Sequence, residues 1–305
     1  MAIHPPRVSI GLPVYNGEQY LVQALESLLG QTFENIEVVV CDNASNDATE
    51  QICRDMAKSD SRLRYVRNDT NIGGFPNHNR VFQLSQGELF MWAGYDDLRH
   101  QDYVARCVEV LDNRPECAIC YSQTQEIDAQ GAPLTDREAI LNTGDSSPAK
   151  RFHDLIGMDH QIEPIYGIIR SDILRKTKLE QSFPDSDRVL AAEISLHGPF
   201  FRIPDCLFYR RRHLENSISM YPSRYERMTW IAPQQASKVT FPYCRQLFEY
   251  FRSIRRAPLQ WRERWRCYSY LLSWLRKYWN LLLHDCTYNA KQLMRPALNL
   301  VLGKL

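Results

Sequence analysis

The sequence predicts an α/β protein in which a mostly parallel, doubly wound sheet is flanked by helices. Between residues 8 and 93, short apolar runs alternate with amphipathic stretches at helical spacing, which is the pattern of successive βαβ units. Polar residues follow each apolar run, at the position where an open α/β sheet binds its ligands. The chain has 305 residues, of which 44% are hydrophobic, and this is enough to bury a sizeable core.

The elements can be placed from this pattern. We expect strands at residues 8–12, 36–41, 63–66 and 88–93 because each run is short, apolar and bounded by turn residues. We expect helices at residues 18–29, 48–57 and 77–85, where apolar residues recur every three or four positions. The run at 36–41 is apolar throughout, so it predicts a strand buried on both faces.

Polar residues follow four successive strands. They are Pro13, Tyr15 and Asn16; Asp42, Asn43, Ser45, Asn46 and Asp47; Asn71, Gly73 and Gly74; and Asp96 and Asp97. Because the carboxyl ends of parallel strands meet at one edge of the sheet, these residues predict a single polar crevice. The sequence has neither GxGxxG nor GxxxxGK[ST], so it offers no dinucleotide fingerprint and no P-loop.

The Asp96–Asp97 pair is the sharpest feature of this crevice. It follows the apolar run FMWAGY, so it lies at a strand end, where two adjacent carboxylates repel each other unless a cation is bound. Hard oxygen ligands suit Mg²⁺ or Mn²⁺, with a diphosphate completing the coordination shell. The alternative is a loop aspartate that caps the next helix.

The segments VSIGLPVYNGEQYLVQALESLLGQTFENIEVVVCDNASNDAT and NDTNIGGFPNHN, followed by the strand ending in YDD, resemble family 2 glycosyltransferases. These enzymes have the nucleotide-sugar-binding fold called GT-A. The resemblance is strong over residues 7–122 and moderate over residues 160–220. It implies a metal-dependent transferase that inverts the anomeric centre of the sugar.

The resemblance also implies roles for individual residues. Pro13, Tyr15 and Glu18 match the first nucleotide-contacting loop, Asp42 matches the carboxylate that binds the donor base, and Ser45 lies in the same element. Asn71, Gly73 and Asn77 match the loop beside the diphosphate and ribose, although Gly73 and Gly74 are also explained by a plain turn. In the metal motif, Tyr95 replaces the first acidic position, which leaves Asp97 for direct contact with Mn²⁺ or Mg²⁺ and Asp96 for the ribose or the sugar.

A general base must remove the acceptor proton in such a displacement. The segment SFPDSDRVLAAEISLHG supplies Asp187, which we place just before a helix and which resembles the catalytic aspartate of the family. Two alternatives stay open: Asp187 only caps this helix, or Asp185 is the base. Beyond it, His213 is a candidate third metal ligand, and Arg210 or Arg211 is a candidate phosphate ligand; a structural histidine and a solvated arginine cluster are the alternatives.

The cysteines and the start of the chain bear on location. The nine cysteines are scattered, and Cys117 and Cys120 form a lone CxxC inside an apolar run, which favours buried thiols over a metal or redox site. The start has no apolar signal region. We therefore expect a cytoplasmic protein, with a peripheral position at the inner face of the membrane as a second option.

The end of the chain differs from the rest. Residues 241–305 carry twelve Lys or Arg against three Asp or Glu, whereas residues 1–222 carry twenty-two against thirty-two. We expect a catalytic domain at 1–222 and a helical, basic, aromatic-rich region at 223–305. The apolar run at 268–283 is interrupted by Arg276 and Lys277, so it is too short and too charged to span a bilayer. The basic region predicts packing on the body, a homodimer or a membrane surface, and not nucleic acid binding.

These observations favour an enzyme that transfers a sugar from a nucleotide diphosphate sugar to a glycan or a lipid-linked glycan, as in polysaccharide biosynthesis. UDP is the expected nucleotide, with dTDP and GDP open. One alternative is a sugar nucleotidyltransferase, which would need a Gly- and basic-rich triphosphate loop that GLPVYNG lacks. The other is a non-catalytic nucleotide-sugar or glycan-binding protein, which would not need the metal carboxylates or the base.

Overall fold

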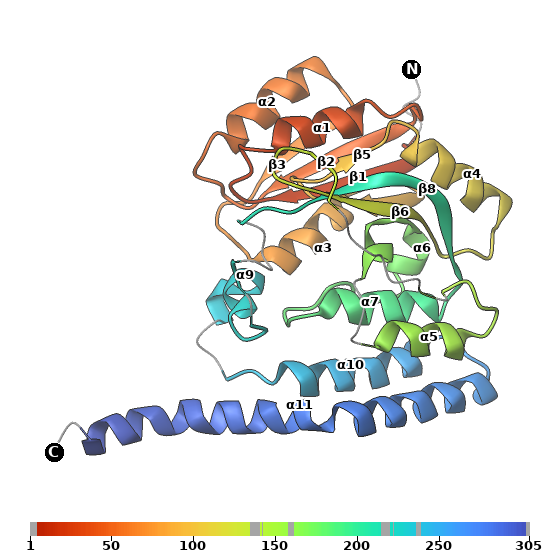
Figure 1. Cartoon of the computed structure of the whole chain (residues 1–305). Helices are drawn as coiled ribbons and strands as arrows, with labels where there is room; N and C mark the ends of the chain where they lie inside the picture. Colours follow the sequence, from red (N-terminus) through yellow and green to blue (C-terminus); the bar gives the residue numbers. More distant parts are fainter. Residues whose placement is uncertain are drawn as a thin grey trace.

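The fold is an eight-stranded sheet between two helical layers, seen in a computed structural model (Figure 1). The model describes residues 5–134, 141, 143–157, 162–214, 220–221, 223–235 and 239–302. The strand order is β3-β2-β1-β4-β7-β6-β8-β5. Among these residues, no helix has the length and apolar character needed to cross a membrane.

The amino-terminal half contains the predicted βαβ units. Strands β1 (Val8–Val14), β2 (Ile36–Asp42), β3 (Leu63–Arg67) and β4 (Leu89–Trp92) pair in parallel. Helices α1 (Leu21–Leu29), α2 (Thr49–Ser59) and α3 (Gly74–Leu84) connect them. The alternation of strands and helices is confirmed, and most boundaries differ from the predicted ones by one to three residues.

The end of β1 shows why one boundary moved. The strand includes Pro13, although we expected proline to end it. Proline has no N–H to donate and is tolerated where one neighbouring strand is missing. Since β4 ends opposite Gly11, Pro13 lies beyond that neighbour and pairs in register only with β2.

The second half of the sheet has mixed pairing. Its strands are β5 (Leu98–Arg99), β6 (Ile119–Ile127), β7 (Ile168–Arg170) and β8 (Phe200–Arg211). Strand β7 is antiparallel to both β4 and β6, whereas the long pair β6–β8 is parallel. This part also contains α4 (Tyr103–Asn113), α5 (Pro148–Ile156), η1 (Glu163–Tyr166), α6 (Ser171–Leu174) and α7 (Ser186–Ser195).

Apolar side chains fill both faces of the sheet. On one face, Leu25 of α1 and Val108 of α4 pack on the strands. On the other face, Phe82 of α3 and Leu190 of α7 belong to a second cluster. Cys117 and Cys120 are buried and not disulfide-bonded, so the prediction that these thiols are buried is confirmed.

Two carboxy-terminal helices, α10 (Pro242–Arg256) and α11 (Trp261–Leu302), form a further layer under α5 and α7 (Figure 1). The preceding α9 (Arg227–Ile231) packs on α3 and is followed by η2 (Pro233–Gln235). Tyr250 of α10 and Trp274 of α11 belong to the same apolar cluster as Leu190, and Trp274 donates a hydrogen bond to the carbonyl of Ile156. The expected packing of this region on the body is therefore observed, whereas a domain boundary at residue 222 stays a prediction.

Candidate active site

A cavity of about 350 Å³ lies at the carboxyl ends of the parallel strands. Seven predicted site residues line it: Pro13, Tyr15, Asn71, Asn77, Asp96, Asp97 and Arg210. The other six lie outside its lining: Glu18, Asp42, Ser45, Gly73, Asp187 and His213. The strand ends therefore converge on one crevice, as the sequence predicts, and the six outlying residues have contacts that explain their position.

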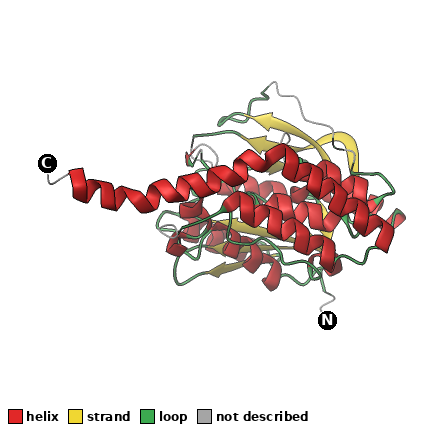
Figure 2. Cartoon of the chain, turned by 90° about the horizontal axis from the view of Figure 1, so that it is seen from below, coloured by secondary structure: helices red, strands yellow, loops and turns green. Residues whose placement is uncertain are grey.

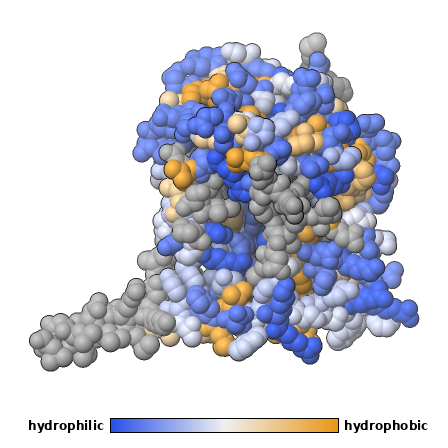
Figure 3. Space-filling model, viewed as in Figure 1, coloured by the Kyte–Doolittle hydropathy of each residue, from blue (hydrophilic) through white to orange (hydrophobic). Residues whose placement is uncertain are grey.

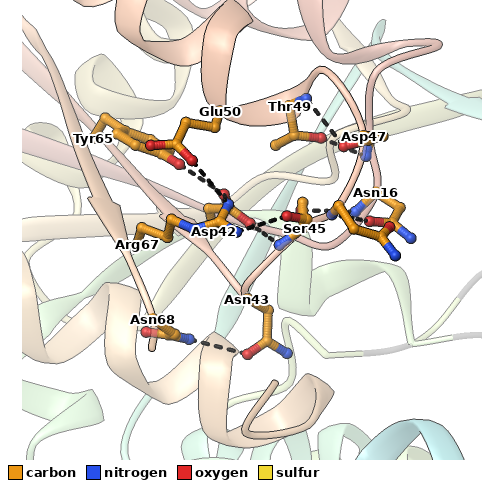
Figure 4. A network of polar contacts seen from close by, with 12 residues as sticks. Asn16, Asp42, Asn43, Ser45, Asp47, Thr49, Glu50, Tyr65, Arg67 and Asn68 are labelled. Carbon is orange, nitrogen blue, oxygen red and sulfur yellow. Dashed lines mark hydrogen bonds and ion pairs between the residues drawn. The ribbon is translucent and has the colours of Figure 1, made fainter. Parts of the chain in front are cut away.

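Asp42 is fully buried at the end of β2 and is the centre of a polar network (Figure 4). Its Oδ1 accepts a hydrogen bond from the Ser45 backbone N–H at 2.8 Å. Its Oδ2 accepts from the Tyr65 hydroxyl and from the Arg67 guanidinium, both at 2.6 Å. Arg67 also donates to the Ser45 carbonyl at 2.7 Å. In this structure Asp42 therefore holds the loop after β2 in place.

Ser45 and Glu18 connect the first two loops of the crevice. The Ser45 hydroxyl accepts from the backbone N–H of Asn16 at 2.9 Å. The Glu18 carboxylate accepts from the backbone N–H of Ala48 at 2.8 Å, at the start of α2. Both side chains brace loops whose neighbours, such as Tyr15, line the cavity.

A chain of amides connects the loops after β2 and β3. Asn43 donates to Asn71 at 2.9 Å and accepts from Asn68 at 3.0 Å. Asn68 also donates to Asn77 at 2.9 Å, and Asn77 donates to the Cys41 carbonyl at 2.8 Å. Buried amides with several partners hold their loops in one arrangement, so the polar wall of the cavity is preorganised.

Gly73 has a structural reason to be glycine. Its φ is +94°, which is unfavourable for residues with a side chain. A Cβ atom there would lie 2.2 Å from the carbonyl oxygen of Ile231. Gly73 thus allows α9 to approach the loop, and it brings Trp230 of α9 to the cavity lining.

Asp96 and Asp97 form another part of the cavity lining. Asp97 Oδ1 accepts from the Arg211 backbone N–H at 3.0 Å, and the Arg211 guanidinium donates to the Asp96 carbonyl at 2.9 Å. Burial, and then the neighbouring charge of Asp96, raise the pKa of Asp97 to about 7. Two close carboxylates in a buried place need a positive partner for both to be ionised.

His213 and Arg210 lie beside this pair but are engaged in other ways. His213 Nε2 is 2.8 Å from Asp96 Oδ2, and its ring contacts Tyr20 with centroids 4.9 Å apart. The guanidinium of Arg210 forms ion pairs with Glu126 and, at 3.4 Å, with Glu163. Arg210 therefore reaches the cavity as part of a charge network.

The donor atoms at this wall fit a hard divalent cation. Asp96 and Asp97 both line the cavity, and burial with the neighbouring charge of Asp96 raises the pKa of Asp97, so a bound cation would favour its ionised form. Within the described ranges, no three His, Cys, Asp or Glu side chains converge as a metal site. A cation would thus be held by the two aspartates, with further oxygens supplied by its ligand.

Asp187 is the second residue of α7, whereas we expected it just before the helix. The helix begins at Ser186, two residues earlier than expected, and Asp185, with φ of +62°, occupies the capping position. Neither aspartate caps the helix through its side chain in the usual way. Asp185 makes no such bond, and the Asp187 carboxylate accepts a hydrogen bond from the adjacent backbone N–H of Arg188 at 2.8 Å.

The two candidate bases differ in their surroundings. Asp185 forms ion pairs with Arg224 and, at 3.2 Å, with Arg227. No salt bridge to Asp187 is found among the described residues. Burial, followed by the charges of Asp185 and Glu180, raises the pKa of Asp187 to about 6. A carboxylate that holds its proton more tightly is the better proton acceptor near neutral pH.

Tyr166 connects Asp187 with the cavity. Tyr166 is the last residue of η1, lines the cavity, and belongs to an element that packs on α7. Burial raises the pKa of the Tyr166 hydroxyl, and the charges of Asp187 and Asp97 raise it further. Tyr166 therefore lies within electrostatic reach of both carboxylates.

Sequence reasoning missed several residues of this site. Tyr65, Arg67 and Asn68 were assigned only to a strand and its end, and Tyr166 and Trp230 received no role. No local pattern marks them, because each is brought to the crevice by long-range packing. One signal could have indicated Arg67. Asp42 ends a strand that was predicted to be buried, and a buried carboxylate needs a cationic partner, which Arg67 on the neighbouring strand supplies.

Comparison with known families decides the class of the chain. A family model described as "Glycosyl transferase family 2" matches residues 9–173, which is more than half of the chain. The chain belongs to this family. It is therefore a transferase, and the resemblance noted in the sequence is confirmed.

Similar proteins from bacteria carry related names. An uncharacterized glycosyltransferase of Haemophilus influenzae is 25% identical over 223 residues, which cover 71% of this chain and 68% of that protein. Chondroitin synthase of Escherichia coli is 31% identical over 217 residues, covering 70% of this chain and 30% of that protein. The family 2 glycosyltransferase described here thus spans less than a third of chondroitin synthase.

Solved structures share the fold. S. aureus TarS 1–349 in complex with UDP aligns with a TM-score of 0.61 at 17% identity, over 90% of this chain and 72% of that chain. The mannosyltransferase PcManGT from Pyrobaculum calidifontis, in complex with GDP-Man and Mn²⁺, aligns with a TM-score of 0.54 at 15% identity, over 99% and 89%. This family 2 glycosyltransferase has the GT-A fold, as predicted.

Proposed function

We propose that this glycosyltransferase moves a sugar from a nucleotide diphosphate sugar to an acceptor hydroxyl with inversion at the anomeric carbon. The observation that carries the proposal is an acidic pair in the cavity lining together with a second acidic centre outside the lining. Asp96 and Asp97 line the cavity, and burial with nearby carboxylates raises the pKa of Asp187, whose charge reaches Tyr166 of the lining, to about 6. The first centre suits a departing diphosphate, and the second suits an incoming hydroxyl.

In this proposal the donor lies in the cavity between the asparagines of the lining (Asn43, Asn71 and Asn77) and the Asp96–Asp97 pair. UDP is our first candidate nucleotide, since UDP and UDP-GlcNAc are bound in TarS structures of the same fold; GDP and dTDP are the alternatives. Asn43 becomes an additional donor ligand because it lines the cavity next to Asp42. Contact between Asp42 and the base requires Tyr65 or Arg67 to move, since the carboxylate is fully buried.

Asp96 and Asp97 hold the diphosphate end through Mn²⁺ or Mg²⁺ in our proposal. A divalent cation supplies the positive charge that stabilises a departing diphosphate, and PcManGT is a neighbour bound to Mn²⁺. The chain contributes the carboxylate oxygens as ligands. Arg211 holds the two aspartates in place, because its backbone N–H donates to Asp97 Oδ1 and its guanidinium donates to the Asp96 carbonyl. His213 orients Asp96 here, and we retain it as a candidate third ligand.

Asp187 acts as the general base in our proposal, and Asp185 positions α7. Asp185 is engaged in ion pairs with Arg224 and Arg227. Among the described residues Asp187 forms no such ion pair, and its carboxylate accepts a hydrogen bond from the Arg188 backbone N–H. The acceptor is the hydroxyl of a glycan or of a lipid-linked glycan. A nucleotidyltransferase and a non-catalytic binding protein have no observation in their favour.

The experiment is a donor screen with a stereochemical readout. The protein is incubated with Mn²⁺ and a panel of UDP-, GDP- and dTDP-sugars, and released nucleoside diphosphate is measured. Release with one donor, together with NMR of a product with inverted anomeric configuration, is the expected result. Release of pyrophosphate from a sugar phosphate and a nucleotide would instead indicate a nucleotidyltransferase. A retained anomer would rule out the single displacement.

A further inference from the structure

The outer sides of α10 and α11 carry large apolar side chains in contact with solvent, and hydrophobic residues lie among hydrophilic ones in this lower part of the molecule (Figure 3). We call this surface the basic aromatic face. Its exposed apolar residues are Phe248 and Phe251 of α10 and Trp261, Trp265, Leu272, Trp279 and Leu283 of α11. Trp261 and Trp265 are 67% and 68% exposed, although tryptophan is normally among the more buried residues. Such a concentration marks an interaction surface.

The spacing of these residues places them on one side of α11. Cys267, Leu271 and Trp274 are buried and face the body. Trp261, Trp265 and Leu272 are separated by four and seven residues, so they form a single stripe on the opposite side. The view from below shows the two helices lying across the molecule in front of the body (Figure 2).

The two helices share this surface through ring contacts. The ring of Tyr268 lies 5.2 Å from that of Phe251 and 6.1 Å from that of Trp265, centroid to centroid. The aromatic groups of α10 therefore continue into those of α11. A broad, shallow apolar surface results, in place of isolated exposed rings.

The charges on this face all have one sign. Among the side chains that the structure describes in α10 and α11, the exposed charged residues are Arg245, Arg252, Arg255, Arg262, Arg266, Arg276 and Lys277. Glu249 and Asp285 are buried. Glu263 is half-buried and accepts hydrogen bonds from Ser147 and Ala149 of the body. The face therefore presents cations and aromatic rings, with no exposed carboxylate from these two helices.

This charge pattern argues against a second copy of the chain as the occupant. In a two-fold dimer the same patch meets itself. Arg245, Arg252 and Arg266 pair with Glu249 or Glu263 of their own helix. The arginines of one copy would still face those of the other, and the described part of the face has no exposed acid to offer across the interface. Like charges brought together at an interface cost free energy.

We propose that the basic aromatic face binds the surface of an anionic lipid bilayer, with both helices parallel to the membrane plane. Tryptophan and phenylalanine partition into the interfacial region, and arginine and lysine attract anionic headgroups. No described helix is long and apolar enough to cross the bilayer, which agrees with a helix lying on it. This inference stands without the proposed reaction, because none of these residues lines the catalytic cavity.

A second cavity, of about 800 Å³, adjoins this face. Phe248 and Arg245 of the face form part of its lining, and Gln181, Phe183 and Pro184 form another wall. That wall ends directly before Asp185. The bilayer-facing side of the molecule therefore continues into a partly apolar cavity next to the segment that carries the candidate base.

The test is vesicle sedimentation of the full chain. We expect binding to phosphatidylcholine vesicles that contain phosphatidylglycerol, weaker binding to phosphatidylcholine alone, and a decline with added salt. The double variant R262Q/R266Q should lose about fivefold in partition coefficient for each cation removed. The variant W261S/W265S should bind more weakly at all salt concentrations. Brominated lipids should quench the tryptophan fluorescence of the wild type.

The matched control is R54Q/K58Q. It removes two exposed cations from α2, on the far side of the sheet from α11, and should leave vesicle binding unchanged (Figure 1). Melting temperatures show whether each variant is folded. The proposal is overturned if vesicles do not bind the wild type, or if the α2 control weakens binding equally. It is also overturned if W261S/W265S converts a dimer into a monomer in light scattering.

Discussion

The buried charge of Asp97 should make the metal-free protein less stable at high pH. Its pKa is about 7 in the folded protein, compared with an ordinary value of 3.8. Between these values the folded state binds a proton that the unfolded chain has released, so this contribution is complete at low pH and is lost as the pH rises through about 7. The difference corresponds to roughly 4 kcal/mol.

The perturbation that isolates this effect is Asp97→Asn. Asparagine keeps an oxygen that can accept the hydrogen bond from the Arg211 backbone N–H, but it cannot ionise. At pH 8 with EDTA the variant should therefore be more stable than the wild type by up to roughly 4 kcal/mol. At pH 4 the carboxyl group is protonated in the folded wild type, and the difference should largely vanish. Urea unfolding followed by tryptophan fluorescence measures both values.

Addition of Mn²⁺ and UDP at pH 8 should reverse the order of stability. A ligand that binds only the folded state stabilises it in proportion to its affinity, and the wild type should gain while Asp97→Asn gains little. A variant that is equally destabilised at pH 4 and pH 8 would refute the reasoning about the buried charge. A variant that gains as much as the wild type from Mn²⁺ would refute the assignment of Asp97 as a metal ligand.

Further predictions concern the base and the loop at α9. Asp187→Asn should lower kcat by about 10²–10⁴-fold and leave UDP affinity unchanged; if Asp185→Asn does this and Asp187→Asn does not, the assignment is wrong. Because Asp187 must be ionised to accept a proton, kcat/KM of the wild type should fall as the pH drops below about 6, and a flat profile from pH 5 to 8 would contradict this. Gly73→Ala should destabilise the fold by more than the roughly 1–3 kcal/mol of backbone strain alone, since its Cβ would clash with Ile231. Gly131→Ala is the control, because Gly131 has a similar φ of +91° and an added Cβ would lie 3.9 Å from Arg211 Nη1, an ordinary contact; equal losses in urea unfolding would show that the clash is unimportant.

The sequence predicted the amino-terminal half of the fold well because its signals are local. Each strand of the parallel half is a short apolar run, and each helix has apolar spacing, so the crevice follows from the order of the elements. The pairing of β6 with β8 had no such signal. It joins residues far apart in the chain, and the pairing of β8 with β5 on its other side brings Arg210 and Arg211 next to Asp97.

The candidate site was predicted in its positions and less well in its contacts. Asp42, Asp96 and Asp97 were marked by strand ends, and the last two line the cavity. That Asp42 is closed off by Tyr65 and Arg67 could not be read from the sequence, since hydrogen-bond partners depend on side-chain geometry across neighbouring strands. The entry of Trp230 into the cavity depends on Gly73, which was predicted for the diphosphate loop or a turn and not for contact with α9.

The central claim is that Asp96 and Asp97 bind the donor diphosphate together with a divalent cation. Titration calorimetry of UDP with and without Mn²⁺ tests it most directly, in the wild type, in Asp97→Ala and in Asp172→Ala, which removes an exposed carboxylate from α6. We predict that Mn²⁺ strengthens UDP binding to the wild type and to Asp172→Ala but not to Asp97→Ala. Equal stimulation by Mn²⁺ in all three proteins would contradict the claim.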